Sequence, residues 1–143
     1  MEHIPIRHWR AAARLILCFC LCGLLAVTGC SQANWVDVSG KATVDGKPLT
    51  KAAVFFAPDK DNPLKAIPGG VVDEDGVYHL TTGDKSGAPL GWYKVFIDYE
   101  HKKGERVPSP VHPKYLAAGQ TPLAVQVVAN PQPGTYDLKF SKK

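Results

Sequence analysis

Residues 91–99 read Gly91-Trp92-Tyr93-Lys94-Val95-Phe96-Ile97-Asp98-Tyr99. Apolar and mainly polar side chains alternate along this stretch with a period of two, the spacing of residues that share one face of a β-strand. The inward face would carry Tyr93, Val95, Ile97 and Tyr99. We therefore predict a strand over residues 91–99 with this face packed into a hydrophobic core.

The same alternation recurs on both sides of this stretch. Residues 36–44 alternate in the same way and end at Asp45-Gly46, a dipeptide that favours a two-residue hairpin turn. The acidic run Asp73-Glu74-Asp75-Gly76 predicts a second hairpin turn with its own Asp-Gly pair. The remaining predicted strands cover residues 53–57, 67–72, 77–81, 123–128 and 135–140.

The fold class follows from the short strands and the turn residues between them. No segment after residue 30 has an apolar stripe with the 3.6-residue period of a helix, and the chain contains 12 prolines and 13 glycines. Short strands separated by such turns favour two packed sheets. We predict an all-β domain over residues 35–143, a single seven-stranded β-sandwich preceded by a signal peptide.

The amino terminus has the composition of an export signal. Arg7, Arg10 and Arg14 precede an apolar run over residues 15–27, which matches the charged and apolar regions of a signal peptide. A membrane-spanning helix needs about 20 apolar residues, more than this run contains. Residues 1–29 are therefore predicted to be a signal peptide, with an uncleaved membrane anchor as the alternative.

The end of the apolar run, Val27-Thr28-Gly29-Cys30-Ser31, resembles the lipobox of bacterial lipoproteins. The resemblance implies cleavage before Cys30, a diacylglycerol thioether on its sulfur and, usually, an acyl chain on its new amino group. Val27, Thr28 and Gly29 would form the cleavage recognition site, although valine replaces the commoner leucine. Ser31 in place of aspartate favours the outer membrane over the inner membrane of a bacterial cell envelope.

Cys30 would be the only cysteine of the mature chain. The three other cysteines lie in the signal peptide, so no disulfide can form within a monomer. Two or three acyl chains suffice for stable membrane anchoring. Residues 30–34 would form the lipidated terminus and a linker that spans at most about 14 Å. Trp35 would then either enter the lipid interface or pack on the edge of the domain.

Three stretches of the predicted domain resemble carboxypeptidase-regulatory-like domains. They are Val38 to Leu49, ending in D-G-K-P-L, Asp73 to Leu80, with D-x-D-G-x-Y-x-L, and Gly87 to Val95, with G-A-P-x-G-x-Y-x-V. Residues 113–115 and 136–140 resemble the tail of small bacterial lipoproteins built on this domain. The resemblance implies a transthyretin-like sandwich and says almost nothing about activity, since a fold does not determine a function.

Several classes of function are disfavoured. Residues 1–29 contain three arginines and one glutamate, so their removal lowers the formal net charge from +4 to +2 and leaves no basic footprint for nucleic acid. The transthyretin-like fold also hosts hydroxyisourate hydrolase, whose terminal Tyr-Arg-Gly-Ser motif is absent here. The chain has no Gly-x-Ser-x-Gly, His-Glu-x-x-His or P-loop motif. We predict no enzymatic activity, no cofactor and no small-molecule substrate.

Two groups of residues carry metal-binding side chains without a convincing spacing. Asp73 and Asp75 begin like an EF-hand loop, but the later bidentate glutamate is missing, and a solvated turn is the preferred interpretation. His101 and His112 are separated by a proline-rich stretch that lacks the ligand spacing of a transition-metal site. We predict no metal site, with Asp73 and Asp75 as weak candidates.

The longest connection between predicted strands runs from Tyr99 to Leu123. Loops of this length in a compact domain are usually functional or disordered. The candidate binding residues on this loop are His101, Lys102, Lys103, Arg106, His112 and Lys114. They would suit an acidic partner such as a lipid headgroup, an anionic glycan or a protein. The alternative is a solvated crossover between the two sheets, pinned by Pro113-Lys114-Tyr115.

Two functions from different classes remain. The first is a non-catalytic binding module of the cell envelope, held at the membrane by lipid on Cys30, that recognises an envelope protein or glycan. The second is a structural accessory or spacer with no specific ligand. Trp92 and Phe96 share the outward face of their strand, which would favour glycan binding, whereas packing against a partner sheet would explain both residues without a ligand.

Replacement of the predicted lipidated residue tests the anchor. Cys30→Ser should abolish palmitate incorporation, because serine lacks the thiol that the lipid modifies. The variant should also leave the membrane fraction or remain there unprocessed. Palmitate incorporation at the wild-type level would contradict the lipoprotein prediction.

Overall fold

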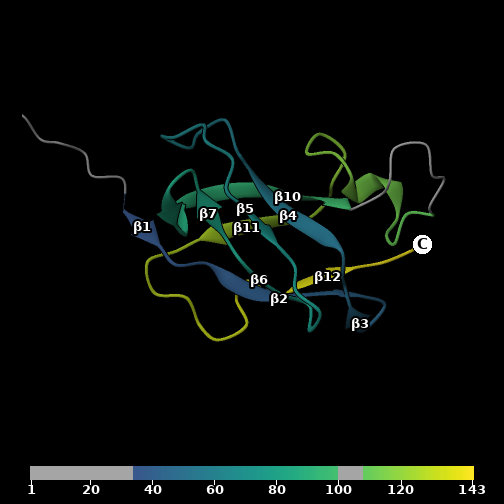
Figure 1. Ribbon diagram of the computed structural model, residues 1–143. Helices are drawn as coiled ribbons and strands as arrows, with labels where there is room; N and C mark the ends of the chain where they lie inside the picture. Colours follow the sequence, from purple (N-terminus) through teal and green to yellow (C-terminus); the bar gives the residue numbers. More distant parts are fainter. Residues whose placement is uncertain (1–33, 100–107) are drawn as a thin grey trace, which may run out of the picture. The chain divides into compact units, whose positions relative to one another are not determined.

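The computed structural model describes residues 34–99 and 108–143, which belong to one compact unit, Ala33–Lys143. Several residues singled out above lie outside the described ranges: Val27, Thr28, Gly29, Cys30, His101, Lys102, Lys103 and Arg106. Within those ranges the protein is all-β, with twelve strands and one 3₁₀ turn at Pro113–Tyr115 (Figure 1). The predicted all-β class is confirmed.

The larger sheet has six strands in the order β11-β10-β4-β5-β7-β8. These strands are β4 (Ala52–Pro58), β5 (Gly69–Val71), β7 (Thr81–Thr82), β8 (Lys85–Ser86), β10 (Gly91–Tyr99) and β11 (Ala124–Val127). β10 has the predicted bounds and pairs antiparallel with β4 over seven residues. It also pairs with β11 on its other side, so β10 lies inside the sheet.

The smaller sheet has four strands and forms a second layer (Figure 1). Its strands are β2 (Ser39–Val44), β3 (Lys47–Pro48), β6 (Val77–His79) and β12 (Leu138–Phe140). β2 is the central strand, because it pairs with each of the other three. A separate pair, β1 (Trp35–Val36) with β9 (Ala88–Pro89), lies outside both sheets. The two layers give a sandwich-like arrangement.

Both sheets send alternate side chains into one hydrophobic core. On β10 the inward residues are at most 1% exposed: Tyr93, Val95 and Ile97. Phe56 of β4 meets Tyr78 of β6 across the core, with ring centroids 6.4 Å apart. The inward residues of the carboxyl-terminal segment are those predicted, namely Tyr136, Leu138 and Phe140. The period of two in the sequence therefore identified the core-facing side chains.

The two predicted Asp-Gly turns have different outcomes. Asp45-Gly46 forms the hairpin between β2 and β3, and both residues have the positive φ, 49° and 82°, that such a turn requires. Residues 73–76 do not join neighbours of one sheet, because β5 lies in the larger sheet and β6 pairs with β2 in the smaller one. The predicted turn itself forms: Gly76 has a φ of 79°, its N–H donates to the Asp73 carbonyl at 3.1 Å, and the Asp73 N–H donates to the Val77 carbonyl at 2.9 Å, beside the bridge between Val72 and Tyr78.

The described part of the chain has twelve strands instead of the seven predicted, because two predicted strands divide and the two-residue strands β3, β8 and β9 were not predicted. Residues 36–44 divide into β1 and β2, because β1 pairs with β9 while β2 pairs within the smaller sheet. Residues 77–81 divide into β6 and β7, which belong to different sheets. Alternating polarity persists through such a change of partner strand, so the sequence pattern does not reveal it.

The carboxyl-terminal strand docks through a close backbone approach. β12 pairs parallel with β2, and the Tyr78 hydroxyl donates a hydrogen bond to the Tyr136 carbonyl, with 2.5 Å between the oxygens. A Cβ atom on Gly40 would collide with the same carbonyl, so this position requires glycine. Burial, assisted by the negative charge of Asp137, raises the pKa of the Tyr78 hydroxyl and keeps it a donor.

A pair of adjacent substitutions tests the facing of β10. Val95→Asp should lower the free energy of unfolding by at least about 3 kcal/mol, because Val95 is fully buried and the new carboxylate would have no partner. Lys94→Asp places the same side chain on the exposed face and should change stability little. Thermal unfolding followed by circular dichroism measures both variants, and equal melting temperatures would show that the face assignment is wrong.

Candidate functional site

The outer face of the larger sheet carries two stacked aromatic side chains. Phe55 of β4 and Phe96 of β10 are cross-strand partners, with ring centroids 5.3 Å apart and an interplanar angle of 22°. Both side chains are half-buried. Gly69 of β5 lies opposite Phe55, and a Cβ atom there would be only 2.8 Å from the Phe55 ring. The Phe55 ring therefore lies directly over Gly69, and this contact helps to position the aromatic pair.

Two loops distant in sequence form apolar walls beside this pair. Ile67, in the β4–β5 connection, is 52% exposed, and Leu116 follows the Pro113–Tyr115 turn. The β4–β5 connection and the segment that follows the Pro113–Tyr115 turn rise on the outer side of the larger sheet (Figure 1). A hollow of about 620 Å³, here called the outer hollow, is lined by Phe55, Ile67, Phe96, Ile97, Asp98, Tyr99 and Leu116. Its volume lies within the range of about 300–1,000 Å³ that is typical of ligand sites.

A buried amide fixes the loop that carries Ile67. Asn62 is 6% exposed, its Nδ2 donates to the Trp92 carbonyl at 2.8 Å, and its Oδ1 accepts from the Trp92 N–H at 3.0 Å. These bonds continue the β4–β10 ladder beyond Pro58, where β4 ends. Gly91 makes room with a φ of 145°, since a Cβ atom there would collide with the amide. One wall of the outer hollow is thus attached to β10.

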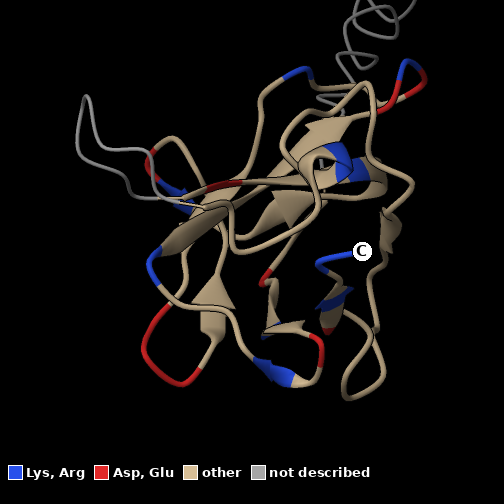
Figure 2. Cartoon of the chain, turned by 90° about the vertical axis from the view of Figure 1, so that its right-hand side faces the viewer, with Lys and Arg blue, Asp and Glu red and all other residues tan. Residues whose placement is uncertain are grey.

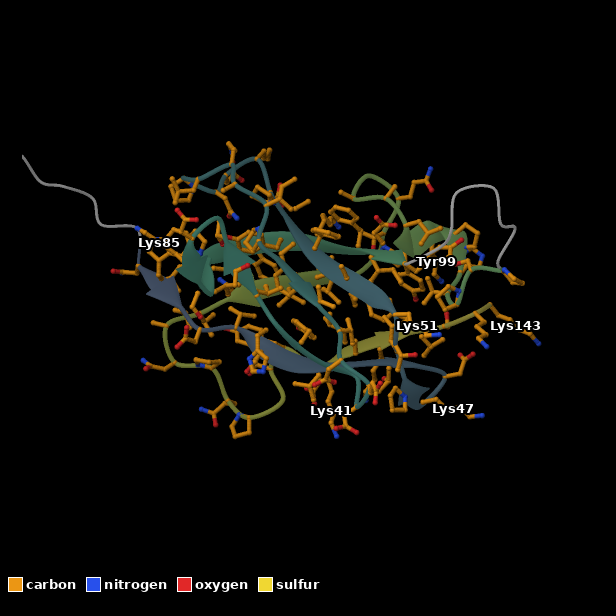
Figure 3. The ribbon with its side chains drawn as sticks, in the orientation of Figure 1. Lys41, Lys47, Lys51, Lys85, Tyr99 and Lys143 are labelled. Atoms are coloured by element: carbon orange, nitrogen blue, oxygen red, sulfur yellow. The ribbon has the colours of Figure 1, made fainter. Side chains whose placement is uncertain are left out.

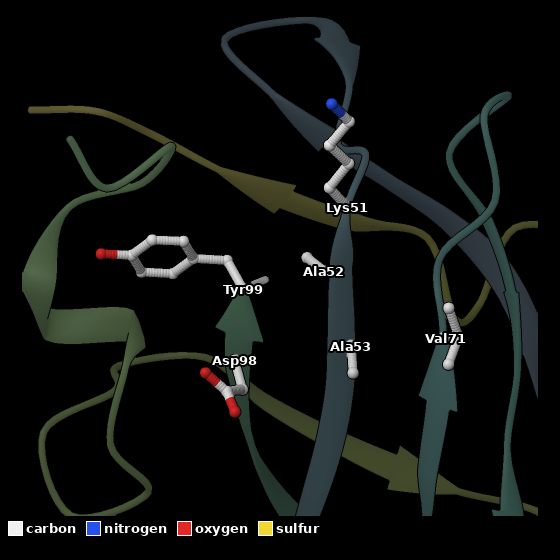
Figure 4. Close-up of a pocket in the computed structure, with 6 residues that line it drawn as sticks. All are labelled: Lys51, Ala52, Ala53, Val71, Asp98 and Tyr99. Carbon is white, nitrogen blue, oxygen red and sulfur yellow. The ribbon is translucent and has the colours of Figure 1, made fainter. Parts of the chain in front are cut away.

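Asp98 and Tyr99 form the polar end of the outer hollow. They also border a smaller groove, whose other lining residues are Lys51, Ala52, Ala53 and Val71 (Figure 4). Figure 4 shows the Tyr99 ring pointing away from β4. Val71 is 78% exposed and lies opposite Ala53 in the sheet. The outer hollow and the smaller groove therefore meet at Asp98 and Tyr99, which line both.

Two residues of the predicted binding loop are described, and both belong to the turn before Leu116. The Nδ1 atom of His112 accepts from the Lys114 N–H at 3.2 Å, and the Lys114 ammonium lies 4.9 Å from the Tyr115 ring centroid. Tyr115 packs on Phe140 of the smaller sheet, with centroids 5.1 Å apart. The turn pins the loop as predicted. The connection does not cross between the sheets, because β10 and β11 are neighbours in one sheet.

The weak metal candidates lie in a turn that is stabilised by its own backbone. Oδ1 of Asp73 accepts hydrogen bonds from the N–H groups of Asp75, at 3.0 Å, and Val77, at 2.7 Å. Asp73 therefore caps the turn between β5 and β6. Among residues 34–99 and 108–143, no group of three or more His, Cys, Asp or Glu side chains is placed to hold a metal ion.

The two tryptophans of the described chain have different surroundings. Trp92 is 50% exposed on the outer face, and Phe96 lines the outer hollow. The explanation that a partner sheet covers both residues is therefore wrong, because the smaller sheet packs on the opposite face of β10. Trp35 is half-buried in β1, and the Lys85 ammonium lies 5.0 Å from its ring centroid. Trp35 thus packs on the domain edge, which is one of its two predicted positions.

The sequence did not single out most residues of the outer hollow. Alternation on β4 placed Phe55 opposite the core face, which was an available signal for one half of the aromatic pair. Ile67 and Leu116 carried no such signal, because they come together only through the packing of two loops. Asn62 was missed for the same reason, since its partner Trp92 is 30 residues away.

Neither the charge distribution nor comparison with known proteins identifies a ligand for the outer hollow. Positive and negative side chains are interspersed over the described loops (Figure 2). Along the same residues, no helix has the length and apolar character needed to cross a membrane. Comparison of the chain with family models, curated proteins and solved structures gave no match. The outer hollow is the candidate binding site because of its own shape and apolar lining.

Removal of the Asn62 amide should loosen the wall that carries Ile67. Asn62→Ala removes both hydrogen bonds that the amide makes with the Trp92 backbone, so the free energy of unfolding should fall by about 1–3 kcal/mol. Asn130→Ala, at an exposed asparagine, is the matched control and should leave stability unchanged. Urea unfolding measures both variants. Identical midpoints would show that the amide does not hold this loop.

Proposed function

We propose that the chain is a lipid-anchored protein of the bacterial cell envelope whose β domain is a non-catalytic binding module for another envelope protein. Lipid on Cys30 would hold the domain at a membrane, and the outer hollow would receive the partner. The half-buried aromatic pair Phe55–Phe96, which lines the outer hollow together with the exposed side chain of Ile67, is the observation that carries the proposal. Exposed apolar surfaces that form a groove commonly mark sites of interaction.

The lining of the outer hollow favours a protein partner over a glycan. Ile67 and Leu116 offer no hydrogen bonds, whereas the hydroxyl groups of a sugar need hydrogen-bond partners when they are buried. An apolar side chain of a protein would contact both walls and the phenyl rings. Asp98 at the polar end would attract a lysine or arginine beside that side chain. The expected partner therefore presents an apolar residue next to a basic one.

The finer description of the fold and location is part of the same proposal. The sandwich-like layers and the Asp45-Gly46 hairpin are consistent with a transthyretin-like domain of the carboxypeptidase-regulatory type. Domains of that type often accompany catalytic domains as accessory modules, which agrees with a binding role. Ser31 after the predicted lipidated residue supports an outer-membrane location. A spacer without a ligand has no need of an apolar hollow on its surface, so the binding role is preferred.

Photo-crosslinking from the outer hollow tests the binding role. A photoreactive phenylalanine analogue at the exposed position Ile67 should form a discrete adduct with an envelope protein in intact cells. Leu116→Glu on the facing wall should abolish this adduct, because it would bury a carboxylate against the partner's apolar side chain. The same analogue at Ser39, exposed on the smaller sheet, should not form the adduct.

Ser39→Glu provides the matched control for the added charge. It introduces the same carboxylate away from the outer hollow and should leave the adduct from position 67 unchanged. Protease resistance and membrane fractionation establish that each variant is folded and located normally. An adduct that survives Leu116→Glu would place the binding surface elsewhere, and the absence of any adduct in the wild-type background would favour the spacer.

A further inference from the structure

The first residues of the domain follow the predicted lipid anchor. They lie at one end of the domain, together with residues 89–90 and the β4–β5 connection. The Asn34 carbonyl accepts a hydrogen bond from the Leu90 N–H at 3.1 Å, and Trp35 pairs with Pro89. Leu90 directly precedes β10, so the first residues of the domain lie beside the first residues of that strand. Figure 1 shows β1 and the β4–β5 connection at the same end of the domain. We call this end the anchor end.

Two exposed apolar side chains lie at the anchor end. Trp92 is 50% exposed and Leu64 is 36% exposed. Asn62 links them, because its amide pairs with the Trp92 backbone and it precedes Leu64 by two residues. Figure 3 marks this end by Lys85 and the opposite end by Tyr99. β10 connects the two ends, since Trp92 and Tyr99 are separated by about 23 Å of extended strand.

The short linker would bring this end to the lipid surface. Residues 31–34 span at most about 14 Å when extended, so lipid on Cys30 would keep Asn34 close to the headgroups. Leu90 is hydrogen-bonded to Asn34, and Trp92 follows Leu90 by two residues. Tryptophan is favoured at membrane interfaces because its ring is apolar and its N–H group remains hydrogen-bonded to water or headgroups.

Charged side chains at the anchor end give no positive surface. The residues are Lys60, Lys65 and Lys85 against Asp37, Asp59, Asp61 and Asp84, and Asp37 accepts a hydrogen bond from the Ser86 hydroxyl at 2.9 Å. Lys65 is also engaged locally, because its ammonium donates to the Lys60 carbonyl at 2.6 Å. A surface without excess positive charge gains little from anionic headgroups, so apolar side chains would provide the contact.

We propose that the anchor end rests on the membrane surface, with Trp92 and Leu64 in the lipid interface. This inference rests on the proposed function through the lipid on Cys30, and it adds the orientation of the domain. β10 would then lead away from the membrane. The Asp98 end of the outer hollow would point toward the aqueous space, where a partner can reach it.

Fluorescence quenching in vesicles tests this orientation. The lipidated protein is reconstituted in phosphatidylcholine vesicles that contain acyl chains brominated near the headgroup, with Trp35 and Trp92 as its tryptophans after cleavage. We expect blue-shifted emission that bromine quenches, and loss of most of this quenching in Trp92→Phe. Leu64→Asp should weaken the quenching, whereas Val71→Asp, at an exposed position of the smaller groove, should not change it.

Mass spectrometry of Cys30 separates the failure of the orientation from the failure of the anchor. Unmodified Cys30 in the purified protein would overturn both the anchor and the orientation. Lipidated Cys30 with a water-like, unquenched Trp92 emission would overturn the orientation alone and leave the binding role of the outer hollow standing. Wild-type quenching in Trp92→Phe would likewise overturn it, because Trp35 would then be the residue at the lipid.

Discussion

Tyr136 joins the two sheets, and the arrangement of both layers depends on it. Its carbonyl accepts from the Tyr78 hydroxyl in the smaller sheet, over a separation of 58 residues. Its own hydroxyl accepts from the Val128 N–H just after β11 of the larger sheet, at 3.2 Å. Gly40 leaves the space for this approach, and the Asp137 carboxylate accepts from the Lys41 N–H at 2.9 Å. These contacts place β12 beside β2 and complete the cover over the inner face of β10.

The completed smaller sheet covers only one face of the larger sheet. Inward residues of β4 and β10 are buried, while the alternate residues face away from the core. On this outer face Phe55 and Phe96 stack on each other, and Gly69 lets the Phe55 ring lie against the backbone. Cross-strand stacking stabilises the pair and leaves both side chains half-buried. The outer hollow is therefore a consequence of how the layers pack.

β10 links the two functional proposals through its rigidity. β11 pairs with residues 91–94 and β4 with residues 93–99, so every residue of β10 is paired with at least one neighbouring strand between the anchor end and the outer hollow. The Asn62 amide attaches the loop of Leu64 and Ile67 to the same strand. In the proposed orientation, Leu64 lies toward the lipid while Ile67 forms a wall of the outer hollow. A single short loop would then contribute to both membrane contact and partner binding.

The sequence by itself determined the all-β class, the bounds of β10, the Asp45-Gly46 hairpin and the inward side chains, because each depends on neighbouring residues. It also supplied the anchor and loop predictions for residues that the structure does not describe. Only the tertiary structure decided that β5 and β6 lie in different sheets, that Trp92 is exposed, and that Ile67 and Leu116 line the same hollow. Alternation separates two faces of a strand, but which face is covered depends on segments that are distant in the chain.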